Sequence, residues 1–205
     1  CATALVAAAR MGAKCMYGGF LGRNELSDFT RSVLCNEGIG MPEDIPYPDA
    51  EPFHSTILVD RATGERTILY SREKVVVPWA RDVRADLIAA SRALFVDHFA
   101  PEAGVREVAA LADHLIIPIR LAIELTGAGD IESVVFALAQ QRACTAVTDG
   151  ARGCWYLEGG KDMRVRHQPA FTVEVADTTG CGDVFHGAYA AALLSGSAIP
   201  DAIRF

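Results

Sequence analysis

Hydrophobic residues recur along the chain with two alternating periods. Spacings of three and four residues predict helices at 1–11, 26–34, 81–90, 102–110, 121–125, 131–140 and 184–194. Short apolar runs between them predict strands at 14–20, 93–96, 114–117, 144–147 and 154–157. Strands separated by helices of this length indicate an α/β fold, with a mostly parallel sheet and helices on both faces.

Two β-rich segments at 55–59 and 66–70 interrupt this alternation. The stretch from Asp60 to Glu65 between them has the composition of a hairpin turn. We therefore expect a small sheet at about residues 53–72 that stands off the main body. Its open edges are a pairing liability, which favours a homodimer formed through this hairpin.

Composition and charge restrict the class of protein. The chain has 205 residues, of which 51% are hydrophobic and 22% charged, as expected for a globular domain rather than a disordered chain. The formal net charge of −7, without a basic stripe, argues against a nucleic-acid partner. No apolar run approaches the ~18 residues of a membrane span, so no membrane partner is expected. The six scattered cysteines lack disulfide or metal spacing, so we expect small buried thiols in a cytoplasmic protein.

The alternation of helices and strands is interrupted at three places. The chain opens inside a predicted helix at Cys1 and stops inside another at Phe205. The helix that ends near Ala110 continues into Leu111 with no room for the strand that an α/β unit requires. We therefore expect one domain over 1–205 that is incomplete at both ends and near 110–111.

The most informative segment is Asp177-Thr-Thr-Gly-Cys-Gly-Asp183, directly before the predicted helix at 184–194. Glycines at a helix start leave backbone N–H groups open, where the macrodipole favours negative charge. Asp183 at that point is badly placed to bind an anion, but well placed to take a proton from a hydroxyl that attacks a phosphate. The combination suggests phosphoryl transfer. A simple capped helix is the alternative, since Asp and Thr are ordinary capping residues.

A second glycine loop, from Thr148 to Gly153, follows a predicted buried strand. Ligands of open α/β sheets bind beyond the carboxyl ends of strands, where this loop lies. Its glycines let the backbone approach a phosphate, and Thr148 and Arg152 can donate to phosphate oxygens. An ordinary Asp-Gly turn explains the loop equally well on its own. No P-loop motif occurs, and Phe185 replaces the third glycine of a dinucleotide fingerprint, which disfavours a dehydrogenase.

Together these segments resemble the PfkB/ribokinase family of carbohydrate and nucleoside kinases. The segment 177–183 resembles the family's C-terminal signature Asp-Thr-x-Gly-Ala-Gly-Asp, with Cys181 in place of the usual Ala. The loop 148–153 is similar to its Thr-x-Gly-x-x-Gly nucleotide loop, and 59–66 to the β lid that covers the sugar. The run 1–12, with the glycines that follow it, resembles the segment after the family's sugar-site motif.

The resemblance implies a ribokinase-like three-layer sandwich and ATP-dependent phosphoryl transfer to a hydroxyl of a small carbohydrate. It implies Asp183 as the general base and an anion hole of N–H groups from Gly180, Cys181 and Gly182. The nucleotide phosphates would be held by Thr148, Gly150, Arg152 and Gly153. Mg²⁺ would bridge the phosphates. A monovalent cation, for which K⁺ is a candidate, would bind at Asp177 and Thr179.

The chain departs from the family pattern in several places. Where the family often carries Asn-x-x-Glu near the metal, this chain has Pro118-Ile-Arg-Leu121, a departure shared with ketohexokinase-like members that slightly favours a ketose acceptor. The family's sugar-site motif and adenine pocket would lie before Cys1 and after Phe205. Two alternatives therefore stay open: a nucleoside kinase of the same fold, and a non-catalytic ligand-binding or regulatory relative.

The remaining polar and aromatic candidates carry less information. Asp97-His98 at a predicted strand end is more often a turn than a functional pair. Surface or core roles are expected for the isolated histidines, which lack metal-ligand spacing: His54, His114, His167 and His186. Trp79 and Trp155 are expected to pack in the core or at an interface. Arg66 on the hairpin is more often a solvated strand residue than a contact to an anionic substrate.

Overall fold

A four-stranded sheet forms the centre of the protein in a computed structural model, which describes residues 2–60, 66–76, 85–96, 112–139, 142–160, 163–175 and 177–205. The strand order is β3 (His114–Pro118), β4 (Cys144–Thr148), β5 (Cys154–Glu158), β6 (Arg166–Gln168). β3 and β4 are parallel, whereas β4–β5 and β5–β6 are antiparallel. The sheet is therefore mixed in the described part, because the short loop between β4 and β5 can only join antiparallel neighbours.

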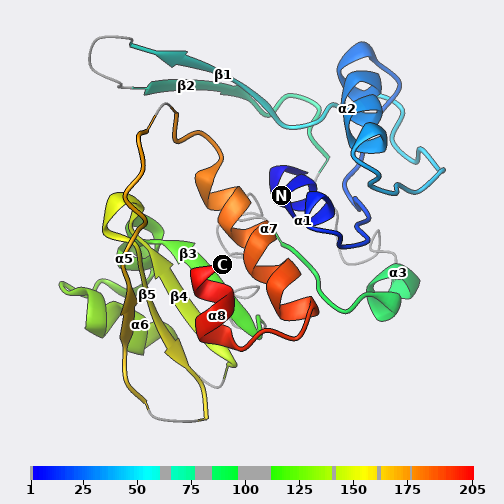
Figure 1. Ribbon diagram of the computed structural model, residues 1–205. Coiled ribbons are helices and arrows are strands. Elements are labelled where there is room, and N and C mark those ends of the chain that lie inside the picture. The colour runs from blue at the N-terminus through cyan, green and yellow to red at the C-terminus, as the bar shows by residue number, and fades with distance from the viewer. Residues whose placement is uncertain are drawn as a thin grey trace.

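Side chains of the strands alternate between two buried faces. On one face, Val147 and Leu157 pack with α5 (Ile119–Thr126) and α6 (Ile131–Ala139). On the other, Ala146 and Tyr156 pack with α7 (Cys181–Leu194) and α8 (Ile199–Arg204). Figure 1 shows the two helix pairs on opposite sides of the strands. The predicted α/β arrangement with helices on both faces is confirmed.

The N-terminal helix α1 (Ala2–Arg10) packs directly on α7. The contact is close because Gly187 of α7 has no side chain: an added Cβ would overlap the carbonyl oxygen of Ala4 and lie 2.8 Å from the Ala7 Cβ. At its other end, Arg10 donates from Nε to Oε2 of Glu37 at 2.8 Å, next to the end of α2 (Glu25–Asn36). Helix α7 thus lies between the sheet and α1.

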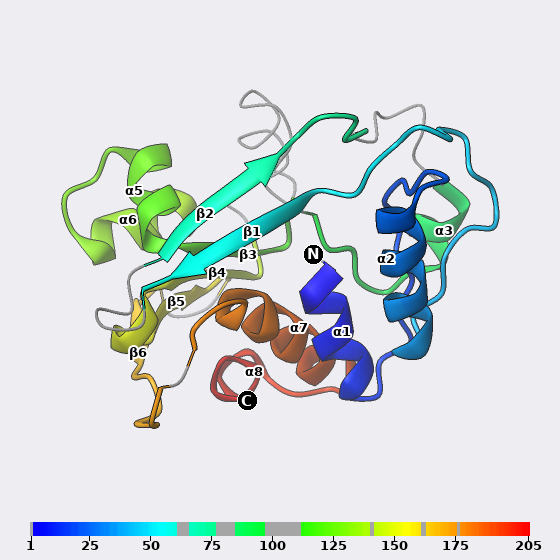
Figure 2. The same cartoon turned by 90° about the horizontal axis from the view of Figure 1, so that it is seen from above.

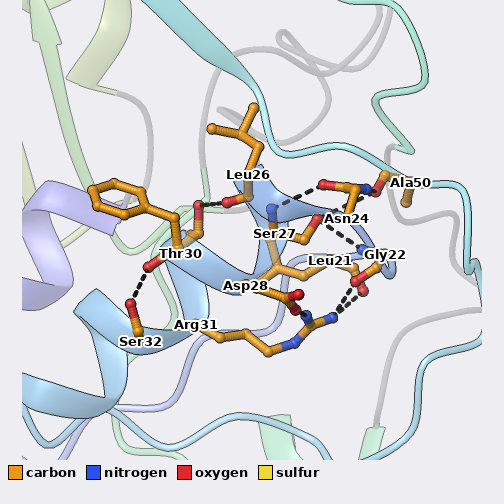
Figure 3. A network of polar contacts seen from close by, with 11 residues as sticks. Leu21, Gly22, Asn24, Leu26, Ser27, Asp28, Thr30, Arg31, Ser32 and Ala50 are labelled. Carbon is orange, nitrogen blue, oxygen red and sulfur yellow. Dashed lines mark hydrogen bonds and ion pairs between the residues drawn. The ribbon is translucent and has the colours of Figure 1, made fainter.

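A buried polar network fixes the start of α2 (Figure 3). The Asn24 carboxamide caps the helix by accepting from the Ser27 N–H at 2.9 Å and donates to the Ala50 carbonyl at 2.9 Å. The fully buried Ser27 hydroxyl accepts from the Gly22 N–H at 3.1 Å and donates to the Ala50 carbonyl at 3.3 Å. The network joins the loop before α2 to the segment that leads into the hairpin.

The predicted hairpin is present as β1 (His54–Val59) and β2 (Arg66–Ser71), with Ile57 opposite Ile68. Its turn at 61–65 and the Arg66 side chain lie outside the described residues. Figure 1 shows it across the top of the molecule, and Figure 2, which looks down from above, shows it over β3 and β4. Its large apolar side chains are 52–58% exposed at Leu58, Val59, Ile68, Leu69 and Tyr70.

Two predicted strands are wrong. Residues 14–20 form only a single parallel bridge, between Met16 and Gly40. Residues 93–96 are irregular, with Leu94 and Val96 61% and 55% exposed. An apolar run becomes a strand only when a neighbour accepts its hydrogen bonds, and the described residues provide no such ladder at either place.

Other predictions differ at their boundaries or are not covered. The helix expected at 81–90 is described as α3 (Ala85–Ala90), and the helix at 184–194 begins three residues earlier, at Cys181. The short strand β6 was missed, since Arg166-His-Gln168 has no apolar alternation. Several expectations concern residues outside the described ranges: the interruption near 110–111, the helix at 102–110, Asp97-His98 and Trp79. No helix in the described ranges combines the length and apolarity needed to cross a bilayer.

Gly187→Ala should destabilise the protein. The new Cβ forces α1 and α7 apart, an overpacking cost of about 1–3 kcal/mol, which exceeds the helix-propensity gain of about 1 kcal/mol. We expect a net loss of up to about 2 kcal/mol in the free energy of unfolding, measured by urea denaturation. Gly182→Ala in the same helix is the control, because nothing lies within 4 Å of its added Cβ. Equal midpoints for the two variants would contradict the packing argument.

The cysteines should differ in reactivity according to burial. Burial raises the pKa of Cys144 to about 11 and the pKa of Cys154 to about 12, which leaves little nucleophilic thiolate at pH 8. Cys35 and Cys181 are exposed. Iodoacetamide at pH 8 should therefore alkylate Cys35 and Cys181 in the native protein, and Cys144 and Cys154 only after unfolding. Peptide mass spectrometry measures the sites, and rapid native labelling of Cys144 would refute the burial.

Candidate active site

The start of α7 is open because of its backbone conformation. Gly180 is the N-cap, with φ of 76°, a left-handed conformation that side chains other than glycine rarely adopt. It provides no side-chain cap, and nothing lies within 4 Å of the Cβ position at Gly182. Since the first N–H groups of a helix lack intrahelical acceptors, an anion can approach this turn. An open helix start of this kind is a common binding place for phosphate groups in proteins.

Asp183 lies in the first turn of α7, and its side chain is half-buried. Cys181 and Gly182 before it are exposed. The Cys181 N–H makes a long contact of 3.3 Å with the Thr178 carbonyl, whereas the Val184 N–H donates to the Gly180 carbonyl at 2.9 Å in the ordinary helical pattern. The predicted base and the predicted anion-binding residues thus share one helical turn.

Asp177 and Thr179 form a turn just before α7. The Thr179 N–H donates to Asp177 Oδ1 at 2.8 Å, and both residues are exposed. This arrangement places a carboxylate next to backbone carbonyls, the oxygen ligands that hard cations prefer. Among the described residues, no group of three or more His, Cys, Asp and Glu side chains gathers to hold a metal ion. A Mg²⁺ site here would therefore depend mainly on nucleotide phosphate oxygens.

The second predicted loop connects β4 to β5 and contains a 3₁₀ turn at Gly150–Arg152. The Asp149 N–H donates to the Gly153 carbonyl at 2.8 Å, which closes the loop. Arg152, whose side chain is 73% exposed, pairs through Nη2 with Asp149 Oδ2 at 2.6 Å. The Asp149 side chain is only 15% exposed, so this ion pair fixes one side of the loop while the Arg152 guanidinium stays accessible to a phosphate.

His167 of β6 supports this loop, a role that the sequence did not suggest. Its Nε2 lies 2.7 Å from the Arg152 carbonyl, and its ring stacks on Trp155 with centroids 4.1 Å apart. The pairing of β5 with β6 sets Trp155 opposite His167. No sequence signal could have revealed the contact, because it depends on the unpredicted strand β6.

The two loops lie at the same end of the sheet. Thr148, where the nucleotide-like loop begins, is opposite Pro118 at the carboxyl end of β3. His186 of α7 contacts the Ile116 carbonyl of β3 at 3.0 Å, which holds the start of α7 over that strand. In Figure 1, α7 begins on the side where α5 leaves β3. The elements that carry the predicted residues therefore converge on the carboxyl end of the parallel pair, where ligands of such sheets bind.

His114 belongs to the core and not to this site. Its Nδ1 lies 2.8 Å from the Tyr189 hydroxyl, between the start of β3 and the middle of α7. Burial lowers the pKa of His114 and raises the pKa of Tyr189, so both groups stay neutral near pH 7. Of the surface and core roles that the sequence left open for His114, the structure shows the core role.

Known proteins resemble this chain in sequence and fold. The family model for pfkB family carbohydrate kinases matches residues 83–205. The ribokinase of Bacillus subtilis (strain 168) is 28% identical over 226 residues, covering 98% of this chain and 75% of that protein. Adenosine kinase from Sinorhizobium meliloti superposes with a TM-score of 0.82 at 19% identity, over 98% of this chain and 72% of that one.

A second similar structure, of a putative ribokinase II from E. coli, was solved in complex with ATP and Mg²⁺. Its TM-score is 0.78 at 16% identity, over 99% of this chain and 77% of that one. At such identities the two crystal structures establish the fold alone, and they confirm the predicted ribokinase-like architecture. The family match extends over more than half of the sequence and includes both predicted glycine loops. The chain belongs to the pfkB family of carbohydrate kinases.

Proposed function

We propose that the protein transfers the γ-phosphate of ATP to a hydroxyl of a small carbohydrate. The observation that carries this proposal is the first turn of α7, where an uncapped glycine start and the Asp183 carboxylate occur together. The open N–H groups and the macrodipole attract an anion, and the carboxylate is suited to accept a proton. Family membership supports phosphoryl transfer as the reaction class.

In the proposed reaction, Asp183 accepts the proton of the acceptor hydroxyl as its oxygen attacks the γ-phosphorus. The new O–P bond forms while the bond to the leaving ADP oxygen breaks. The N–H groups of Gly180, Cys181 and Gly182 donate to the oxygens of the migrating phosphoryl group, where negative charge is concentrated. Mg²⁺, when bound, neutralises charge on the β- and γ-phosphates. The backbone at the start of α7 holds these N–H groups in place, and only the Cys181 N–H has to leave an acceptor, its long contact of 3.3 Å with the Thr178 carbonyl.

The proposed nucleotide site is the loop between β4 and β5, with Thr148, Gly150, Arg152 and Gly153 as its phosphate-binding residues. Its position beyond the carboxyl end of β4 supports this role, as does the complex of the E. coli relative with ATP and Mg²⁺. We also propose that Asp177 and Thr179 bind a monovalent cation such as K⁺ through carboxylate and carbonyl oxygens. A cation bound there would fix the turn before α7 and, through it, the position of Gly180.

Two candidate functions, a sugar kinase and a nucleoside kinase, differ in the class of acceptor. Similarity to the B. subtilis ribokinase favours a sugar, whereas the fold is also that of adenosine kinase from S. meliloti. Release of ADP in the presence of ketoses, aldoses, sugar acids or nucleosides distinguishes the two. A protein that releases no ADP with any of them would be the non-catalytic relative, for which the lack of Asn-x-x-Glu at 118–121 is the supporting feature.

Asp183→Ala should lower kcat by about 10²–10⁴-fold, the usual contribution of a general base. Nucleotide affinity, measured by calorimetric titration with the non-hydrolysable ATP analogue AMP-PNP, should change little because the Asp183 side chain is not among the proposed phosphate-binding groups. Asp201→Ala is the matched control, since Asp201 is also an acidic residue in the first turn of a helix, α8, away from the site. A kcat for Asp183→Ala close to that of the control would show the base assignment to be wrong.

We further propose that the β1–β2 hairpin pairs with a second copy of the protein and forms a lid over the site. The exposed apolar residues on both of its faces support this. Ile68→Lys and Leu69→Lys place a charge on opposite faces, because successive strand residues alternate. Light scattering after size exclusion should give a dimer for the wild type. It should give a monomer for the variant whose lysine lies on the hairpin face that the dimer buries. A monomeric wild type at micromolar concentration would refute the dimer.

A further inference from the structure

His186 connects the first turn of α7 to the sheet. Its Nδ1 lies 2.6 Å from the Gly182 carbonyl, and its Nε2 lies 3.0 Å from the Ile116 carbonyl in β3. Carbonyl oxygens only accept hydrogen bonds, so the ring donates from one or both nitrogens according to its protonation. A single side chain therefore spans two backbone groups that are far apart in the sequence.

The first turn of α7 needs such an anchor. Cys181, Gly182 and Val184 are exposed, so apolar packing restrains this turn weakly, whereas Ala188, Tyr189 and Ala192 further along are buried. Immediately after His186, Gly187 packs tightly against α1. The ring thus lies at the boundary between the packed part of α7 and its open start.

We infer that His186 is a positioning residue for phosphoryl transfer, which holds the Gly180–Asp183 turn at a fixed height over β3. This inference rests on the proposed function. The carbonyl that His186 contacts is that of Gly182. This residue and those beside it supply the N–H groups and the carboxylate of the proposed site. Displacement of these groups by a fraction of an ångström weakens stabilisation of the transition state more than it weakens binding of the ground state.

Three substitutions separate hydrogen bonding from ring volume. His186→Ala removes both, His186→Phe keeps a ring of similar size without donors, and His186→Gln keeps a donor of similar reach. Arg92→Ala is the control: Arg92 donates to the Leu194 carbonyl at 3.0 Å, at the far end of the same helix. Circular dichroism confirms that each variant is folded before steady-state kinetics are measured on the full-length protein.

We expect kcat to fall roughly 10- to 100-fold in His186→Ala and His186→Phe, with the KM for ATP within about threefold of wild type. His186→Gln should recover a substantial part of kcat, and Arg92→Ala should match the wild type. The inference is overturned if Phe is as active as the wild type, if Gln is no better than Phe, or if KM changes instead of kcat. A loss in Arg92→Ala equal to that in His186→Ala would also overturn it, since any restraint on α7 would then suffice.

A readout without turnover separates this inference from the proposed function. If the wild type releases no ADP with any acceptor, the proposed kinase activity fails, and amide hydrogen exchange then decides the anchoring role. Peptides that cover 180–187 should exchange faster in His186→Phe than in the wild type or in His186→Gln. Equal exchange in all three proteins would show that the ring does not restrain the turn.

Discussion

In the proposed reaction, the first turn of α7 has to meet two opposing electrostatic requirements. Its N–H groups must stay open to an anion, while Asp183 must keep its negative charge a few residues away. The macrodipole reconciles them, because it favours a carboxylate and a bound phosphate alike at a helix start. Gly180 makes this possible: its left-handed backbone begins the helix without a capping side chain that would occupy the same N–H groups. Every proposed step of the reaction depends on this short segment.

The surrounding layers hold that turn in place. Helix α7 is apolar around its circumference and lies between the sheet and α1, with buried small residues at Gly187, Ala188, Ala191 and Ala192. Small side chains bring the neighbouring backbones close, so the helix axis has little freedom to shift. Because the start of α7 projects beyond this packed region, its own position needs the polar contact through His186. The later turns of α7 are thus held by packing, whereas its first turn stays accessible for the proposed reaction.

The sequence predicted the parts of this arrangement that depend on local pattern. The apolar run after Asp183 and the glycines before it predicted α7, and buried runs predicted β3, β4 and β5. Patterns failed where pairing decides the outcome: the apolar residues at 93–96 have no strand partner among the described residues, whereas the polar β6 pairs with β5. The contacts of His186 with Ile116 and of His167 with Arg152 join distant segments, so no spacing rule could have predicted them.

In the proposed function, reliance on backbone groups would explain how an acidic protein binds an anionic nucleotide. With a formal net charge of −7, the overall field repels a phosphate at long range, so attraction has to be local. Backbone N–H groups at a helix start provide such a local attraction, and they do so whatever side chain their residues carry. Cys181 illustrates the point: its side chain is exposed, and its proposed contribution is a backbone N–H. A thiol at this position is therefore compatible with the same anion hole as the alanine that the family signature usually has.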